Sequence, residues 1–200
     1  MTPKIGVAPV RRGEIVRATI RCLAHEGYSG LTMKKVAREA GVSQGILHYY
    51  FKDKRAILIA ALGQVMSDLN RRVIAAARGV REPRARLRSL ISACLDVAAT
   101  NREFWVVLVE FWGEMMHDGE LAAINAGLYD RLRRVIGDIV TAGTKAGIFR
   151  RVNPLQAGAI ILALVDGISL QLTFEPNAFT LSKANRFCED AVLRYLGRER

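Results

Sequence analysis

The chain has 200 residues, of which 50% are hydrophobic, and a net charge of +11 from 30 Lys and Arg against 19 Asp and Glu. This composition excludes an intrinsically disordered chain, and the length allows one large domain or two small ones with a sizeable core. The longest apolar run, residues 157–165, is too short to span a bilayer, and three widely spaced cysteines exclude a disulfide-rich scaffold.

The positive charge is concentrated in the first part of the chain. Residues 1–60 hold eleven basic and four acidic side chains, a surplus of +7 that leaves +4 for the remainder. This surplus predicts a negatively charged partner, either nucleic acid or an anionic membrane surface. The opening sequence MTPKIGVAPVRR lacks a signal-type apolar segment, and free cysteines suit a reducing compartment. We therefore expect a cytoplasmic protein without a membrane partner.

A first helix is predicted over residues 12–24, where apolar residues recur at helical spacing and Gly27 follows as a stop. The preceding residues 2–12 mix prolines with basic side chains. They are expected to form an extended arm that touches the backbone or minor groove of DNA, or to be disordered.

Two short helices joined by a glycine-containing turn are predicted over residues 32–51. Thr32 is a good N-cap for the first helix, Gly41 ends it with a positive φ angle, and Ser43 can cap the second. The apolar side of the second helix is expected to carry Ile46, Leu47 and Tyr50. Together with the first helix, this arrangement is typical of a helix-turn-helix DNA reader.

The outward side of the second short helix is expected to face the major groove. Gln44 can pair with a base edge, Gly45 permits close approach, and His48 and Tyr49 point the same way. Basic side chains that can neutralise phosphates flank this face, namely Lys34, Lys35, Lys52, Lys54 and Arg55. Two alternatives stay open, since His48 can be a solvated residue and Ser43 can serve only as a cap.

These residues resemble the DNA-binding domain of the tetracycline-repressor (TetR) family of transcriptional regulators. The resemblance rests on the pattern T-x-x-x-VA-x-x-AGVS-x-G-x-x-x-YF-x-x-K-x-x-L from Thr32 to Leu58. It implies DNA contacts by Thr32, Lys34, Lys35, Ser43, Gln44, Gly45, His48, Tyr49 and Lys54. Tyr50 and Phe51 are assigned to the core of the domain instead.

The rest of the chain is predicted to be helical throughout. Asp53 can cap a long fourth helix that continues past Gly63, and the division into a DNA-binding domain (1–62) and a ligand-binding and dimerisation domain (63–200) is placed there. Further helices are predicted over residues 83–101, 102–117, 120–146, 153–174 and 181–196. The expected fold is all-α, with a three-helix reader followed by a helical bundle.

The segment 102–117 is apolar nearly all round and contains both tryptophans of the chain, so it is expected inside the bundle. Aromatic rings near carboxylates suit a cationic small molecule. The predicted ligand-binding residues are Asp96, Trp105, Leu108, Val109, Glu110, Trp112, Met116 and Asp166. Each also has an alternative role as a core, capping or solvated residue.

Three segments sharpen the resemblance towards the betaine-regulator (BetI)-like subgroup of the family: PKIGVAPVRR near the start, FWGEMMH at 111–117 and LVDGISL at 164–170. This subgroup implies choline or a related quaternary ammonium compound as the effector. The sequence departs from the subgroup at Leu108 and Ser169, where the resemblance implies aromatic residues.

The segment 153–174 alternates small residues with large aliphatic ones, a composition that favours close helix packing. With the last helix, it is predicted to form a two-fold interface between subunits. The predicted interface residues are Ala157, Ile160, Ile161, Leu164, Ile168, Phe187 and Ala191. The alternative is burial of the same residues inside one subunit.

These observations predict a ligand-responsive repressor that binds a palindromic operator as a homodimer, without a cofactor or a metal. A sequence-independent basic DNA-binding protein is the first alternative. A helical-bundle enzyme using Glu114, His25 or His117 is the second, although no sequence pattern places these side chains together.

Overall fold

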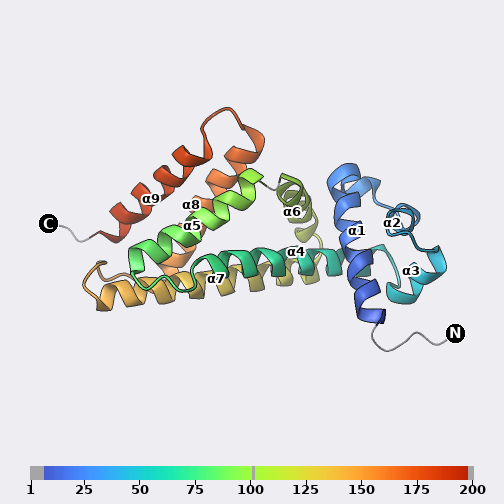
Figure 1. The fold of residues 1–200 in the computed structure, drawn as a ribbon, viewed down its shortest axis with the longest axis horizontal. Coiled ribbons are helices and arrows are strands. Elements are labelled where there is room, and N and C mark those ends of the chain that lie inside the picture. Colours follow the sequence, from blue (N-terminus) through green and yellow to red (C-terminus); the bar gives the residue numbers. More distant parts are fainter. Residues whose placement is uncertain (1–6, 101, 198–200) are drawn as a thin grey trace. The chain divides into compact units, whose positions relative to one another are not determined.

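The computed structural model describes residues 7–100 and 102–197, and all regular secondary structure within these ranges is helical (Figure 1). The helices are α1 (Val7–Gly30), α2 (Met33–Glu39), α3 (Gln44–Tyr50), α4 (Lys54–Ala76), α5 (Pro83–Thr100), α6 (Arg102–Met115), α7 (Gly119–Lys145), α8 (Pro154–Phe174) and α9 (Leu181–Leu196). The all-α prediction is confirmed.

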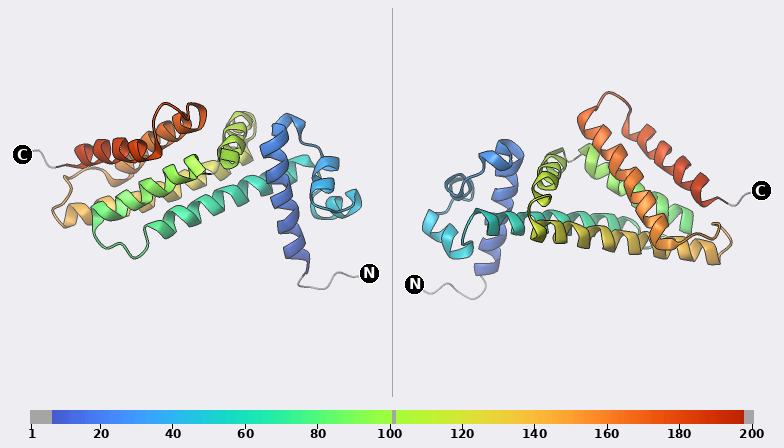
Figure 2. Two further views of the ribbon diagram at one scale, coloured as in Figure 1. Left: turned by 45° about the horizontal axis from the view of Figure 1, so that its top comes forward. Right: turned by 180° about the vertical axis from the view of Figure 1, so that it is seen from behind.

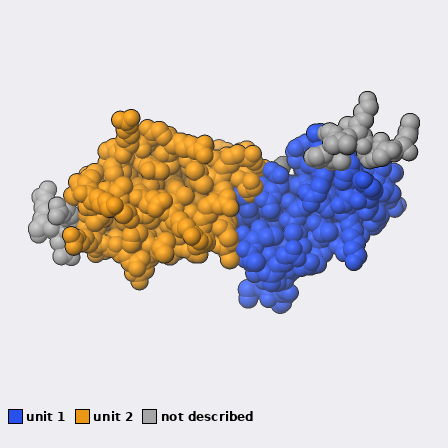
Figure 3. Space-filling view, turned by 90° about the horizontal axis from the view of Figure 1, so that it is seen from below, with its two compact units in different colours: residues 1–66, 103–124 blue, residues 67–102, 125–200 orange. Residues whose placement is uncertain are grey.

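The chain forms two compact units, which Figure 3 shows in different colours. Unit 1 comprises Met1–Met66 and Glu103–Ile124, and unit 2 comprises Ser67–Arg102 and Asn125–Arg200. The predicted domain boundary after residue 62 lies close to Met66, where the chain first passes from unit 1 into unit 2. No sequence signal indicates that α6 clusters with the N-terminal helices. Helices α4 and α7 each contribute residues to both units.

Unit 1 contains the three-helix reader, in which α1 packs on α2 and α2 packs on α3. Helix α1 begins at Val7, so the extended arm predicted over residues 2–12 is wrong for residues 7–12, while residues 1–6 lie outside the described part of the chain. Pro9 does not prevent the helix because proline is tolerated in a first turn, where its missing N–H has no intrahelical acceptor. The prolines and the basic side chains of this segment had suggested an extended conformation.

Local capping signals set the reader's two short helices as predicted. The Thr32 hydroxyl accepts a hydrogen bond from the Lys35 backbone N–H, and the Ser43 hydroxyl accepts one from that of Ile46, both at 3.2 Å. Gly41 has a φ angle of 64°, the left-handed conformation that ends α2.

The axis of α1 breaks at Gly27, where φ is 71° and ψ is 174°. A Cβ atom added to this glycine would lie 2.8 Å from Oε1 of Glu110. Both the positive φ angle and the nearby carboxylate therefore require glycine here. The helix is interrupted at this residue, as predicted, but α1 resumes beyond it and ends at Gly30. The close approach of α6 is a second reason for glycine at the break.

Unit 2 is a bundle in which α5, α8 and α9 pack against one another, as Figure 2 also shows. The Asn153 side chain caps α8 by accepting hydrogen bonds from the backbone N–H groups of Leu155 and Gln156, at 3.0 and 3.1 Å. Gly158 lets α8 approach α7 closely, since a Cβ atom there would lie 2.7 Å from the carbonyl oxygen of Arg133. These two residues fix the start of α8 and permit its close approach to α7.

Within the described residues, α8 is the one helix long and apolar enough to cross a membrane by length and composition. It packs on α5 and α9, and 44% of its most apolar window is buried inside the protein. These contacts are typical of the central helix of a bundle.

All three cysteines are buried and free, as predicted. Burial raises the pKa of the Cys94 thiol to about 12 and that of Cys188 to about 11. The thiols therefore stay protonated and behave as small core side chains.

Candidate functional site

The outward surface of α3 carries the side chains that the sequence predicts for base reading. Gln44, Gly45, His48 and Tyr49 are all exposed, and Tyr49 retains 70% of its accessible surface. The ring of Tyr50 meets that of Tyr49 edge-on, with 5.1 Å between the centroids. This contact packs the Tyr49 ring against its neighbour at the end of the helix.

Ile46 does not face the core, which corrects the prediction. Its side chain is 45% exposed, whereas Leu47 is completely buried and Tyr50 is half-buried. Helix α3 has only seven residues, so a narrow strip centred on Leu47 suffices to pack it on the other helices. Sequence reasoning missed Ile46 because an isoleucine beside a leucine reads as core.

The hydroxyl groups of Thr32 and Ser43 act as helix caps in the free protein. A capping hydroxyl accepts a hydrogen bond through an oxygen lone pair, so its own O–H remains able to donate to a phosphate oxygen. Both residues stand at the N-terminal ends of helices, where anions are favoured.

Two of the predicted phosphate-binding lysines have partners inside unit 1. Lys35 forms an ion pair with Glu26 and donates to the carbonyl oxygen of Gly30 at 3.0 Å. Lys54 donates to the carbonyl oxygen of Tyr28 at 2.8 Å, and its Nζ lies 4.8 Å from the centroid of the Tyr28 ring. Both lysines thus tie the end of α1 to the neighbouring helices.

Other cations around α3 are open to solvent. Lys34 and Lys52 are exposed at the start of α2 and just after α3. Arg55 instead pairs with Asp118 at 2.8 Å and with Glu120 at 2.9 Å, which joins the starts of α4 and α7. The pair with Arg55 holds the pKa of the Asp118 carboxyl below its usual value.

The predicted ligand residues on and just beyond α6 lie in unit 1. Trp105 and Leu108 are buried, Val109 and Trp112 are half-buried, and the two indole rings meet edge-on with 6.0 Å between centroids. Met116 is 81% exposed, so this structure does not enclose it among the other predicted ligand residues. It lies beyond Met115, the last residue of α6, where the helical pattern no longer holds.

Glu110 has a defined partner that the sequence does not reveal. Its Oε2 accepts a hydrogen bond of 2.5 Å from the backbone N–H of Tyr28, directly after the break at Gly27. The carboxylate satisfies an N–H group that the broken helix leaves without an intrahelical acceptor. Glu110 thus connects α6 to the reader.

The other two predicted ligand carboxylates lie in unit 2 and differ in environment. Asp96 is exposed on α5, whereas Asp166 is half-buried and accepts a hydrogen bond of 2.7 Å from the Tyr129 hydroxyl. Burial raises the pKa of Asp166, and the Tyr129 hydrogen bond offsets part of that rise. One turn further along α8, the hydroxyl oxygen of Ser169 is completely buried and has no hydrogen-bond partner among the described residues.

The predicted dimer residues fall into two groups. Ala157 and Ile161 are completely buried inside unit 2, so they cannot face a second subunit, and their assignment to the interface is wrong. Ile160 and Phe187 are 47% and 46% exposed. The remaining positions are exposed or half-buried, namely Leu164, Ile168 and Ala191. The apolar composition of α8 cannot distinguish its two sides, because both are apolar.

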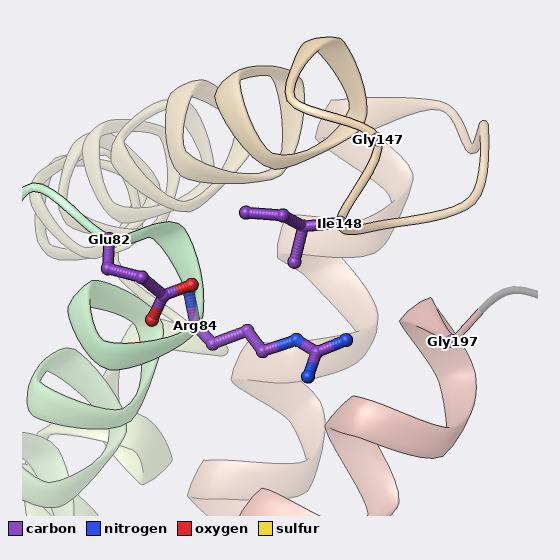
Figure 4. A pocket seen from close by; sticks show the side chains of 5 residues that line it. All are labelled: Glu82, Arg84, Gly147, Ile148 and Gly197. Carbon is purple, nitrogen blue, oxygen red and sulfur yellow. The ribbon is translucent and has the colours of Figure 1, made fainter.

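A pocket of about 760 Å³ lies in unit 2 where the start of α5, the connection from α7 to α8 and the end of α9 meet (Figure 4). Its lining residues are Glu82, Arg84, Gly147, Ile148 and Gly197. The Glu82 carboxylate already accepts hydrogen bonds from the backbone N–H groups of Arg84 and Ala85. None of the predicted ligand residues lines this pocket. Across the described residues, no group of three or more His, Cys, Asp or Glu side chains could hold a metal ion.

Comparison with known proteins identifies both parts of the chain. Residues 15–61 match the model for bacterial regulatory proteins of the tetR family, and residues 83–197 match that for the C-terminal part of BetI-type transcriptional repressors. The HTH-type transcriptional regulator BetI of Pseudomonas fluorescens is 32% identical over 190 residues, with 92% of each chain covered. That of Burkholderia ambifaria is 33% identical over 174 residues, covering 84% of this chain and 85% of the relative.

Solved structures share the fold. A transcriptional regulator from Saccharomonospora viridis, in complex with choline, has a TM-score of 0.86 at 24% identity and covers 96% of this chain and 100% of its own. A regulator from Pseudomonas aeruginosa has a TM-score of 0.84 at 22% identity, covering 94% of this chain and 90% of its own. The named relatives are transcriptional regulators and not enzymes. With its tetR-type reader and BetI-type C-terminal part, the chain belongs to the TetR family of DNA-binding transcriptional regulators.

Proposed function

We propose that this regulator is a repressor that binds a palindromic operator as a homodimer and leaves it when a small molecule occupies the helical bundle. The observation that carries the proposal is the exposed face of α3, where Gln44, His48 and Tyr49 are open to solvent, together with the exposed cations Lys34 and Lys52 on either side of α3 in the sequence. This face combines base-edge donors and acceptors with flanking cations, as a major-groove reader requires. Operator binding implies a cytoplasmic location, where bacterial DNA is accessible.

Substitutions should distinguish the side chains that read bases from those that also stabilise the fold. We expect Gln44→Ala to relax the preference at one base position per half-site, without changing the thermal midpoint of unfolding, because Gln44 is exposed. Lys54→Ala should lower the affinity for every DNA sequence, flatten its salt dependence and lower the thermal midpoint, because it removes the bond to Tyr28. Fluorescence anisotropy over a salt series and thermal unfolding measure these effects.

Lys52→Ala is the matched control for Lys54→Ala, since Lys52 is exposed and lies two residues earlier. This variant should flatten the salt dependence of DNA binding without lowering the thermal midpoint of unfolding. Equal thermal midpoints for the two lysine variants would show that the Lys54 contacts add nothing to stability.

The second subunit is proposed to cover the exposed apolar side chains of α8 and α9. Ile160 and Phe187 are half exposed, and the Phe187 ring is held edge-on by Phe179 with 5.5 Å between centroids. In a two-fold interface the same surface patch of each subunit meets its copy, so an apolar patch on one subunit would be covered by the apolar patch of the other. A dimer would place two readers about 34–36 Å apart, or at a multiple of this distance, on a palindromic site.

The effector is proposed to be a choline-like compound or another hydrophobic cation. The S. viridis neighbour is in complex with choline, and relatives of this chain are named BetI. Asp166 supplies a half-buried carboxyl group, and the buried Ser169 oxygen is a polar atom that a ligand or a water molecule could satisfy. Leucine at position 108 and serine at 169 leave fewer aromatic groups than a quaternary ammonium cage employs, which favours testing several cations.

Ligand binding is proposed to reach the reader through helices that belong to both units. Residues 54–66 of α4 lie in unit 1 and its remainder in unit 2, and α7 likewise passes from one unit to the other. The starts of these two helices are joined by Arg55 and Asp118, and Glu110 links α6 to the end of α1. A shift of either helix would therefore move the reader, with a coupling of about 1–3 kcal/mol.

The Glu110 contact provides a direct test of this route. We expect Glu110→Met to lower the free energy of unfolding by about 1.5–3 kcal/mol, because it removes a charged acceptor from the Tyr28 N–H. The effector should then change operator affinity less than it does in the wild type. Glu110→Gln is the control, since it keeps an oxygen acceptor and should retain most of the response. An undiminished effector response in Glu110→Met would remove this contact from the route.

The proposed function is tested by footprinting the purified protein on the intergenic DNA upstream of its own gene, with choline, betaine aldehyde and a panel of hydrophobic cations. We expect a protected palindrome that one of these compounds releases. Protection that no compound disturbs would keep the DNA reader and reject the cationic effector.

A sequence-independent DNA-binding protein is the main alternative. It predicts no discrete footprint and a ratio of specific to non-specific affinity near one. That result would rule out binding to a specific operator.

A further inference from the structure

Ile46 is an exposed isoleucine of α3, and the packing of the fold does not explain an apolar side chain at its position. Ile46 keeps 45% of its surface accessible although it lies next to the completely buried Leu47. The packing of α3 on unit 1 therefore does not require an apolar side chain at position 46. An exposed apolar side chain on a surface that reads a ligand is expected to meet an apolar part of that ligand.

The local structure holds Ile46 ready for such a contact. Its backbone N–H donates to the Ser43 hydroxyl at 3.2 Å, which fixes the first turn of α3. Its β-branched side chain has few rotamers, so little conformational entropy is lost on contact. The preceding residue is Gly45, and a Cβ atom there would have only the Ser43 hydroxyl oxygen, at 3.9 Å, within 4 Å. The first turn can thus come close to another surface.

Ile46 also has an apolar neighbour on the same outward side. Tyr49 follows three residues later, a spacing that puts the two side chains on one face of a helix. Tyr49 is the more exposed of the two, at 70%. The exposed surface of α3 therefore carries an apolar strip, formed by Ile46 and Tyr49, in addition to the hydrogen-bonding group of Gln44 at the start of the helix.

The major groove offers one distinctive apolar group, the C5 methyl of thymine. We propose that Ile46 is a specificity-determining residue that packs against the methyl group of one thymine in each operator half-site. This inference rests on the proposed operator binding and adds the chemical class of the base that is read. Cytosine presents no methyl group at that position, and its amino group would face an apolar side chain without an acceptor.

The test replaces each thymine of the footprinted operator by uracil, one position at a time, which removes only the methyl group. One position in each half-site should respond. Substitution there in a single half-site should lower the wild-type affinity about fourfold, the value for one buried methyl-sized group. Substitution in both half-sites should lower the affinity about fifteenfold, because the two losses multiply. Anisotropy titrations with labelled duplexes measure both.

Two variants assign the effect to Ile46. Ile46→Ala should bind thymine and uracil duplexes equally, whereas Gln44→Ala should retain the full uracil sensitivity. Because Ile46 is half exposed, we expect Ile46→Ala to fold, and its thermal midpoint is measured alongside. Ile46→Val, which keeps a branched side chain, should retain part of the discrimination.

The outcomes separate this inference from the function on which it rests. A discrete footprint whose affinity is unchanged by every uracil substitution overturns the role of Ile46 and leaves the operator intact. The same is true if Ile46→Ala remains as sensitive to uracil as the wild type. Absence of any discrete footprint rejects operator binding, and the thymine contact with it.

Discussion

Phe51→Ala should lower the free energy of unfolding by about 3–5 kcal/mol, the cost of removing a buried aromatic ring from a packed core. Phe51 is only 2% exposed, and the Arg12 guanidinium lies 4.8 Å from its ring centroid. Its backbone N–H donates to the Leu47 carbonyl at 2.9 Å, so the ring stands where α3 ends. Loss of the ring leaves a cavity under α3, and operator binding should be lost with the fold. Urea unfolding followed by circular dichroism measures the change.

Tyr49→Ala is the matched control, two residues earlier in the last turn of α3. Tyr49 is 70% exposed, so its truncation should change the free energy of unfolding by less than about 0.5 kcal/mol. It should nevertheless weaken operator binding, because it removes a side chain from the reading face. If both variants lost stability equally, the assignment of Phe51 to the core and Tyr49 to the surface would be wrong.

Gly158→Ala should destabilise unit 2 by about 1–3 kcal/mol, the usual cost of overpacking. The added Cβ atom would lie 2.7 Å from the carbonyl oxygen of Arg133 and 3.0 Å from its Cα. Both are backbone atoms of α7, so α8 must move away as a whole and lose part of its packing. Thermal unfolding of the variant against the wild type measures this loss.

Gly167→Ala supplies the control within the same helix. A Cβ atom at position 167 would have no neighbour within 4 Å. Alanine should therefore stabilise the helix by about 0.5–1 kcal/mol through its higher helix propensity. A gain in stability for Gly158→Ala as well would contradict the close contact between α7 and α8.

The reader could be predicted well because its signals are local. Thr32 and Ser43 accept hydrogen bonds from backbone groups three residues away, and Gly41 adopts the positive φ angle that its neighbours require. A capping interaction involves only nearby residues, so it can be recognised without knowing the fold. The exposure of Gln44 and Tyr49 followed from the same local register.

Predictions that depended on distant contacts succeeded less well. Lys35 and Lys54 looked like free cations, but their partners are Glu26, Gly30 and Tyr28 in the end of α1. The partner of Glu110 is the Tyr28 backbone, 82 positions away in the chain. No spacing rule connects residues so far apart, because their proximity exists only after the helices have packed.

The amino-acid sequence by itself determined the helices, their caps and most of the exposed face of α3, since these follow from hydrogen bonds and periodicity within a few residues. The tertiary structure decided which apolar residues are core and which are surface. Ile161 is completely buried while its neighbour Ile160 is half exposed, and Leu47 is buried while Ile46 is not. Hydrophobicity drives burial without direction, so only the packing of whole helices selects the side that faces inward.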